Sequence, residues 1–236
     1  MAFLKSEAPN CDWCQHKKTC FYNFLGDAEA KKAWREMRVA SPFKSGEVVF
    51  HEGTPAPGLY VVCKGSAKVY KSTRSGQQLI ARIELAGDLL GHITLLADDG
   101  PYTGTAEALE LSVISMIDAK SFFDFLARFP DGARALLREL SRDVRRGENK
   151  ARDIAFKSAK SRIADTLLRT ARPQGKSYPL LINIKRKDLA ELAGLTLETS
   201  VRTLHELELK GLIKRAEKNI KILKEDELRR LASSAS

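Results

Sequence analysis

The sequence predicts an α+β protein in which a β-roll is followed by a long helix and by a small domain of helices and a β-hairpin. Two changes of pattern along its 236 residues predict this fold. Short β-prone runs separated by glycine-containing turns fill residues 41–117, which is typical of a barrel or roll. From about residue 119 the apolar residues recur with a helical period. We expect four segments: an arm of residues 1–24, a roll domain of residues 25–130, a long helix of residues 131–156 and a C-terminal domain of residues 157–236.

The composition is that of a soluble chain with a hydrophobic core, since 43% of the residues are hydrophobic and 30% are charged. No stretch approaches the roughly 20 apolar residues that cross a bilayer, and the first residues are too polar for a secretion signal. We therefore expect a cytoplasmic protein with no membrane partner. The net charge of +10 is concentrated in residues 156–236, where 18 Lys and Arg outnumber 10 Asp and Glu. This imbalance indicates either a polyanionic partner or an ordinary solvated basic surface.

The roll is predicted from a series of strands that follow one short helix. The helix is expected over residues 27–40, and glycine-containing turns separate the strands. No helix-length run lies between residues 41 and 117, which argues against parallel β-α-β units. The expected strands cover residues 47–51, 58–64, 66–71, 79–83 and 111–117.

The helix of residues 131–156 carries a narrow apolar stripe on a very polar background. Its apolar or small residues recur in steps of three and four, as in a coiled coil. Such a stripe favours contact with a second copy of the chain, the alternative being a helix that lies on its own roll. Gly147 and Ala151 bury little area, so the expected contact is weak at its middle. The predicted dimer-interface residues are Leu137, Leu140, Val144, Gly147, Ala151 and Ile154.

The C-terminal domain has the layout of a winged helix-turn-helix. Gly194 lies where the turn between the last two helices needs a positive φ, and Thr196 is a good N-cap for the helix that follows. A hairpin after that helix would form the wing. The expected elements are helices over residues 161–170, 187–193 and 196–210, a strand over residues 180–184, and a hairpin over residues 211–215 and 220–223.

The helix of residues 196–210 is the candidate for contact with DNA. Glu198 and Arg202 are four residues apart and share a face near its N-terminal end, which a recognition helix inserts into the major groove. An arginine fork matches guanine and a carboxylate can accept from cytosine, although the two side chains can also form an ordinary surface ion pair. Contacts to phosphates are expected from Thr196, Thr199, Lys185, Arg186 and Lys187.

Three of the four cysteines, Cys11, Cys14 and Cys20, lie within ten residues near the N-terminus. In a reducing compartment this spacing points to metal or redox chemistry rather than to structural disulfides. Thiolates are soft ligands that suit iron–sulfur clusters or zinc. The fourth cysteine, Cys63, lies in an apolar strand, where it is either the remaining ligand or a small core residue.

Four motifs accompany the long helix, at residues 43–53, 58–66, 86–91 and 194–202. Together they resemble the CRP/FNR superfamily of bacterial transcription regulators, and its FNR branch in particular, over essentially the whole chain. The resemblance implies a sensory β-roll of the cyclic-nucleotide-binding type, a dimerisation helix and a winged helix-turn-helix that reads a palindromic operator in double-stranded DNA. It further implies a homodimer that works with RNA polymerase and is not an enzyme.

Two departures refine what the resemblance implies. In cyclic-nucleotide binders of the superfamily, a Glu and an Arg-Ser pair hold the ligand, whereas this chain has His92 and Tyr102-Thr103 at those places. A cyclic phosphate without its arginine loses its main charge partner, so we expect no cyclic nucleotide. In the recognition helix, Val201 stands where the FNR branch has a serine. Valine can contact a thymine methyl group but cannot donate a hydrogen bond, so we expect an FNR-like half-site with altered outer positions.

The resemblance also implies a cofactor. In FNR, three cysteines with the spacing of Cys11, Cys14 and Cys20 hold an oxygen-labile [4Fe–4S] cluster together with a fourth cysteine. This chain has Ser115 at the place of that fourth ligand, and Cys63 is the cysteine left to complete the set. We expect a dimeric regulator that senses oxygen, nitric oxide or redox state through the cluster. The alternatives are a zinc or thiol–disulfide switch at the same cysteines, or a thiol oxidoreductase, against which nothing pairs a catalytic base with the Cys11-x-x-Cys14 motif.

Overall fold

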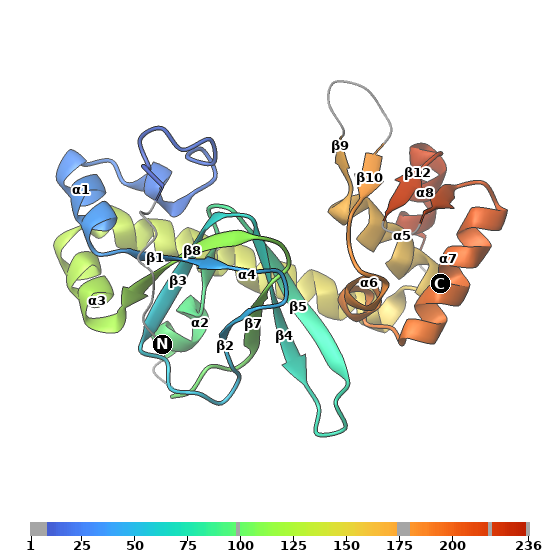
Figure 1. The fold of residues 1–236 in the computed structure, drawn as a ribbon, viewed down its shortest axis with the longest axis horizontal. Coiled ribbons are helices and arrows are strands. Elements are labelled where there is room, and N and C mark those ends of the chain that lie inside the picture. The colour runs from blue at the N-terminus through green and yellow to red at the C-terminus, as the bar shows by residue number, and fades with distance from the viewer. Residues whose placement is uncertain (1–8, 98–99, 174–179, 217–218, 235–236) are drawn as a thin grey trace. The chain divides into compact units, whose positions relative to one another are not determined.

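The computed structural model of the chain describes residues 9–97, 100–173, 180–216 and 219–234 (Figure 1). The chain divides into two compact units, Met1–Val144 and Arg145–Ser236. The division falls within the long helix α4 (Pro130–Phe156), which begins one residue before its predicted start and ends where the sequence predicts. The finer domain boundaries expected from the sequence stay predictions.

The N-terminal unit is built from two four-stranded antiparallel sheets with helices before and after them. One sheet has the strand order β1-β8-β3-β6, and the other has the order β2-β7-β4-β5. The strands are β1 (Val39–Phe43), β2 (Val48–Phe50), β3 (Gly58–Lys64), β4 (Ser66–Ser72), β5 (Gln78–Leu85), β6 (Leu89–Leu90), β7 (Thr105–Ala108) and β8 (Ser112–Asp118). The helices are the 3-10 helix η1 (Phe21–Phe24), α1 (Ala28–Glu36), α2 (His92–Ala97), α3 (Ala119–Arg128) and the start of α4. The predicted roll is confirmed.

The structure corrects two predictions for this unit. The helix expected over residues 27–40 ends at Glu36, because residues 39–43 pair with β8, from Val39 opposite Met116 to Phe43 opposite Ser112. Pairing with a distant strand thus overrides the local helical pattern. The short helix α2 lies among the strands, where the sequence predicts no helix, and it is held there by burial of one of its faces.

A single hydrophobic core joins the arm, the β1-β8-β3-β6 sheet and the start of α4. Trp34 of α1 is completely buried, with its ring stacked on Phe21 at 4.5 Å between centroids and tilted against Phe125 of α3 at 5.6 Å. The same core contains Cys11, Cys20 and Tyr22 from the arm, Leu25 directly after it, and Ala135 and Leu136 from α4. The arm and the first turns of α4 therefore pack into the same hydrophobic core.

The C-terminal unit packs helices around a four-stranded sheet of order β11-β12-β10-β9. Its elements are α5 (Ala159–Thr170), β9 (Arg172–Pro173), β10 (Leu180–Ile182), α6 (Arg186–Ala193), α7 (Leu197–Leu209), β11 (Ile213–Arg215), β12 (Ile220–Ile222) and α8 (Glu225–Ser233). The completely buried core residues include Ile163, Leu167, Leu189, Leu204 and Ile220. The helix α8, which follows the hairpin, is not among the elements predicted from the sequence.

The turn between α6 and α7 has the predicted geometry. Gly194 ends α6 with φ 65° and ψ 42°, in the left-handed region that favours glycine. The Thr196 hydroxyl accepts a hydrogen bond from the backbone N–H of Thr199 at 3.2 Å and so caps α7. These features confirm the helix-turn-helix. In the part of the chain that the structure describes, no helix is both long and apolar enough to cross a membrane.

Candidate functional site

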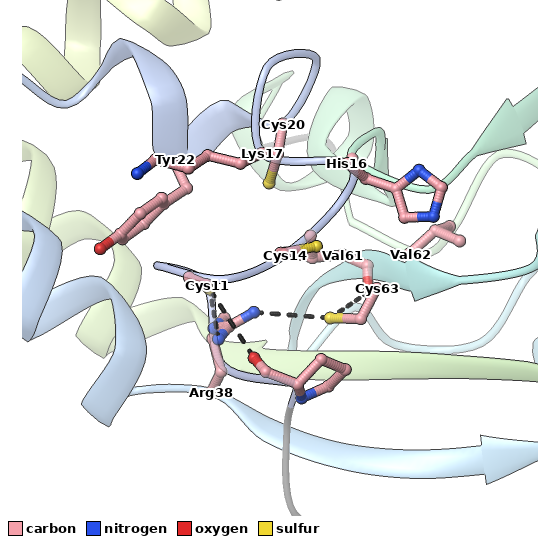
Figure 2. A pocket seen from close by; sticks show the side chains of 12 residues that line it. Cys11, Cys14, His16, Lys17, Cys20, Tyr22, Arg38, Val61, Val62 and Cys63 are labelled. Carbon is pink, nitrogen blue, oxygen red and sulfur yellow. Dashed lines mark hydrogen bonds between the residues drawn. The ribbon is translucent and has the colours of Figure 1, made fainter.

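The four cysteines of the chain line one pocket of the N-terminal unit (Figure 2). Cys11, Cys14 and Cys20 come from the arm, whereas Cys63 comes from β3. Figure 2 shows the sulfur atoms of Cys14, Cys20 and Cys63 facing one space, while the His16 ring points away from it. The other lining residues are Pro9, Lys17, Tyr22, Arg38, Val61, Val62 and Gly87. The structure thus brings together the cysteines that the sequence singles out.

Cys63 lies beside Ser115, the residue that stands where the FNR branch has its fourth cysteine ligand. Strands β3 and β8 pair with Val61 opposite Ser115, and the register shifts between Val62 and Lys64, so Cys63 stands at a bulge. Its sulfur is 3.1 Å from the Ser115 hydroxyl oxygen. A thiol at position 115 would therefore lie next to the position of the Cys63 thiol.

A buried cation lies among these sulfur atoms. Arg38 is only 8% exposed, and its guanidinium donates from Nη2 to Cys11 Sγ at 2.8 Å and from Nη1 to Cys63 Sγ at 3.4 Å. Burial raises the pKa of Cys20 to about 12. Burial also raises the pKa of Cys11, although the charge of Arg38 opposes that shift. The thiols of Cys11 and Cys20 are therefore protonated at neutral pH, and a metal bound by them would displace protons.

The first part of the cysteine loop is tied to α1 by a polar cluster. The Tyr22 hydroxyl donates to the Asp12 carboxylate, and Arg35 Nη1 lies 2.8 Å from both Asp12 Oδ2 and the Tyr22 oxygen. These contacts, led by the Tyr22 hydrogen bond, hold the pKa of Asp12 below its usual value. The loop is thus anchored at the residue that directly follows Cys11.

The described residues contain no group of three or more His, Cys, Asp or Glu side chains already placed to hold a metal ion. The chemistry of the donor set nevertheless fits an iron–sulfur cluster, because four soft sulfur ligands line one pocket with a guanidinium among them. A cluster of several iron atoms is larger than one ion, so its ligands need not converge on a single point. Three of the four sulfur ligands, Cys11, Cys14 and Cys20, lie on one loop that precedes η1.

His92 and Tyr102 stand where cyclic-nucleotide binders of the superfamily have residues that hold the nucleotide, and both contact other residues of this chain. His92 Nε2 lies 2.8 Å from Asp143 Oδ2, and both side chains are buried. The Tyr102 ring stacks on Phe50 at 3.9 Å between centroids, and its hydroxyl donates to the Gly58 carbonyl at 2.6 Å. This part of the roll is therefore packed with the chain's own aromatic side chains.

The start of α7 presents an exposed surface that the sequence assigns to DNA. Glu198, Val201 and Arg202 are exposed, as is the capping residue Thr196, whereas Thr199 is half-buried. Because their side chains are four residues apart on one helix, Glu198 and Arg202 share a face.

The basic residues at the N-terminal end of α6 differ from one another in accessibility. Lys185 and Lys187 are exposed, which suits the phosphate contacts expected of them. Arg186 is half-buried, and its Nη2 donates to the carbonyls of Ala216 and Asn219 at 3.0 and 3.3 Å. Its guanidinium therefore supports the β11–β12 hairpin.

The apolar stripe on α4 is largely exposed within the single chain. Leu137 is 63% exposed and Val144 is 61% exposed, whereas Leu140 packs against the core that holds the arm. Gly147, Ala151 and Ile154 are also exposed. An added Cβ at Gly194 would lie 3.4 Å from Ile154, so the end of the stripe lies close to the turn before α7.

Comparison with known families assigns a family to the roll and to the C-terminal domain. Residues 41–129 match the family of cyclic nucleotide-binding domains, and residues 161–231 match the family of Crp-like helix-turn-helix domains. The chain belongs to the CRP/FNR superfamily of transcription regulators. Members of this superfamily are regulators rather than enzymes, in agreement with the resemblance seen in the sequence.

Individual relatives of this CRP/FNR regulator come from more than one branch. It is 28% identical over 195 residues to the CRP-like cAMP-activated global transcriptional regulator of Mycobacterium tuberculosis, covering 80% of this chain and 86% of that protein. It is 26% identical over 229 residues to the fumarate and nitrate reduction regulatory protein of Escherichia coli, covering 95% of this chain and 91% of that protein.

The fold also matches solved structures of the superfamily. The structure of FixK2 from Bradyrhizobium japonicum superimposes with a TM-score of 0.73 and 24% identity, covering 84% of this chain and 99% of that one. This similarity establishes the fold of the CRP/FNR regulator.

Two features of the site are not predicted from the sequence. Arg38 lies just before β1 with no motif around it, and nothing in the one-dimensional pattern places it under Cys11. Asp143 is one of many charged residues on α4, so its pairing with His92 follows only from packing. Both are buried charged or polar groups, whose partners depend on tertiary structure.

Proposed function

We propose that this CRP/FNR regulator is a homodimer that binds a palindromic operator and senses oxygen, nitric oxide or redox state through an iron–sulfur cluster, with [4Fe–4S] as the favoured form. The observation that carries the proposal is the gathering of Cys11, Cys14, Cys20 and Cys63 around one pocket. When bound, such a cluster would supply a redox-active iron centre ligated by four thiolates.

The proposed route from the cysteines to the dimer interface is the shared hydrophobic core. Cys11 and Cys20 are buried in the same core as Ala135 and Leu136 of α4, and Leu140 packs against it. Leu137 and Val144, on the exposed side of the same helix, are the proposed contacts with the second copy. A change in how the arm packs would therefore alter the packing of the α4 residues that position this interface.

DNA recognition is proposed for the exposed N-terminal part of α7. In a dimer, two such helices about 34 Å apart would enter successive major grooves of a palindromic site. Arg202 and Glu198 are the proposed base contacts, Val201 adds an apolar one, and Thr196, Thr199, Lys185 and Lys187 are the proposed phosphate contacts. Arg186 is proposed in a supporting role, because its guanidinium is bound to the wing.

Arg202→Ala should weaken binding to an operator selected from random duplex DNA by about 1–3 kcal/mol and relax the preference at one base pair per half-site. Fluorescence anisotropy on single-base operator variants measures both effects. Lys185→Ala is the matched control, since loss of a phosphate contact should weaken binding to all variants evenly and lower the salt dependence. An Arg202→Ala protein that keeps its base preference would remove Arg202 from the proposed readout.

The signal is proposed to be redox chemistry rather than a cyclic nucleotide. Although one relative is described as cAMP-activated, this chain places His92 and Tyr102 where that class of ligand needs Glu and Arg. The pairing of His92 with Asp143 and the stacking of Tyr102 on Phe50 occupy the same region of the roll. Both observations favour the cysteine pocket as the sensory site.

Anaerobic purification followed by iron, acid-labile sulfide and zinc analysis tests the proposal. We expect iron and sulfide in the wild-type protein and their loss in Cys14→Ala, with a loss of signal-dependent promoter control in the same variant. A colourless protein with one zinc would establish the zinc alternative at the same cysteines. A protein free of any metal that binds its operator at full strength would leave a thiol–disulfide switch in place of the cluster.

A further inference from the structure

Arg38 is placed in the cysteine pocket by the short connection between α1, which ends at Glu36, and β1, which begins at Val39. Its side chain is more than nine-tenths buried. Figure 2 shows the guanidinium lying between Cys11 on the arm and Cys63 on β3. Arg38 thus donates hydrogen bonds to a cysteine sulfur on each of the two elements that build the pocket, the arm and β3.

The partners of this guanidinium are unusual for a buried charge. Among the residues that the structure describes, its hydrogen bonds go to two sulfur atoms, and its buried Nε has no partner. Sulfur is a weak hydrogen-bond acceptor, and a buried cation without an anion is costly. Without a bound cluster the site therefore holds one uncompensated positive charge, which indicates that it is built to hold an anion.

Thiolates around a metal cluster supply such an anion. Four thiolates ligating an iron–sulfur cluster bring negative charge into the same pocket, and the arginine fork can donate to two ligands at once. Hydrogen bonds to the sulfurs are among the features by which proteins tune these clusters. Arg38 is already within hydrogen-bond distance of two of the four proposed ligands.

We propose that Arg38 is the charge partner of the thiolate-ligated cluster, bridging Cys11 and Cys63, and that retention of the cluster depends on it. The inference rests on the proposed function, since it requires the cysteines to hold a cluster. Arg38 acts here as a positioning residue, because it contacts the ligands rather than the iron. The competing explanation is that Arg38 only ties the arm to the sheet.

The two explanations predict opposite effects on the metal-free protein. Arg38→Met keeps the length and apolar stem of the side chain but removes the buried charge. If Arg38 serves the cluster, the metal-free variant should unfold at a temperature equal to or above that of the wild type, because an unbalanced buried charge is gone. If Arg38 is only a tether, the same variant should unfold at a lower temperature.

The experiment compares wild type, Arg38→Met, Arg38→Lys and Lys17→Met after anaerobic reconstitution with iron and sulfide. Loss of the cluster to a chelator is followed by visible absorbance, and the metal-free forms are melted. We expect Arg38→Met to lose the cluster about 10- to 100-fold faster than wild type. Arg38→Lys should be intermediate, because an ammonium keeps the charge but not the two-pronged geometry. Lys17 lines the same pocket, and in the described part of the chain no hydrogen bond joins its side chain to a sulfur atom. Lys17→Met, which removes the same charge, should therefore match wild type.

The outcomes separate this inference from the proposed function. A wild-type protein that takes up no iron and sulfide overturns the proposed function and, with it, the role of Arg38. A wild-type protein that holds the cluster while Arg38→Met loses it no faster overturns the inference alone. Equal acceleration by Lys17→Met also overturns it, because the effect would then belong to net charge rather than to the sulfur contacts. Should Arg38→Met fail to fold, Arg38→Lys decides, since retention equal to wild type would remove the need for the fork.

Discussion

Moving the fourth thiol from β3 to β8 should leave the cluster in place. We expect Cys63→Ser to reduce anaerobically retained iron by at least about tenfold, because a serine hydroxyl is a hard, neutral donor that replaces a soft thiolate poorly. Adding Ser115→Cys to Cys63→Ser should restore iron to near the wild-type level. The reason is geometric, since Cys63 Sγ and Ser115 Oγ are 3.1 Å apart across the β3–β8 pair.

Iron and sulfide content per chain, with visible absorbance, measures both steps of this exchange. The single variant Ser115→Cys is the control, because it keeps Cys63 and should hold the cluster as wild type does. Ser115 is completely buried, so unfolding curves of the three variants are needed to separate ligand loss from packing effects. Full iron content in Cys63→Ser would show that Cys63 is a core residue and that another group completes the set.

The proximity of Cys63 to position 115 illustrates what the sequence can and cannot predict. Turn residues, β-prone runs and a heptad stripe are local signals, and they predict the roll, α4 and the helix-turn-helix correctly. The approach of Cys63 to Ser115 depends on the register of β3 against β8 and on a bulge, both set by pairing between residues about 50 positions apart. The sequence therefore leaves the ligand role of Cys63 open, and the fold brings Cys63 to the other cysteines.

Other parts of the fold escape prediction for related reasons. Residues 39–43 continue a helical pattern in the sequence but form β1, because β8 offers them a partner. The helix α8 carries three acidic residues in its first turn, Glu225, Asp226 and Glu227, a signal that could have revealed it. Arg38 has no such signal, since its importance lies entirely in which sulfur atoms surround it.

Loss of the completely buried Trp34 ring should strongly destabilise the N-terminal unit. Trp34 is completely buried between Phe21 of the arm and Phe125 of α3, and its core includes Cys11, Cys20 and the first buried residues of α4. Trp34→Ala should lower the free energy of unfolding of the N-terminal unit by about 3–5 kcal/mol, because it removes a large apolar ring and leaves a cavity. Denaturant unfolding followed by circular dichroism measures this cost.

The second tryptophan provides a matched control. Trp13, in the same arm, is 88% exposed, so Trp13→Ala should change the free energy of unfolding by no more than about 0.5 kcal/mol. Trp34→Phe is expected to lie between the two, since it keeps an aromatic ring and removes an indole N–H that has no partner among the described residues.

The same variants test whether the arm and α4 are coupled through this core. Cys11 and Cys20 are buried in wild type, so their alkylation should be slow in the metal-free protein and should accelerate in Trp34→Ala but not in Trp13→Ala. If the core transmits the state of the arm to the dimer interface, Trp34→Ala should also change the dimer dissociation constant measured by sedimentation. A protein whose buried thiols become reactive while its dimerisation stays at the wild-type value would place the signalling route elsewhere, because the arm would then have loosened without any effect on α4.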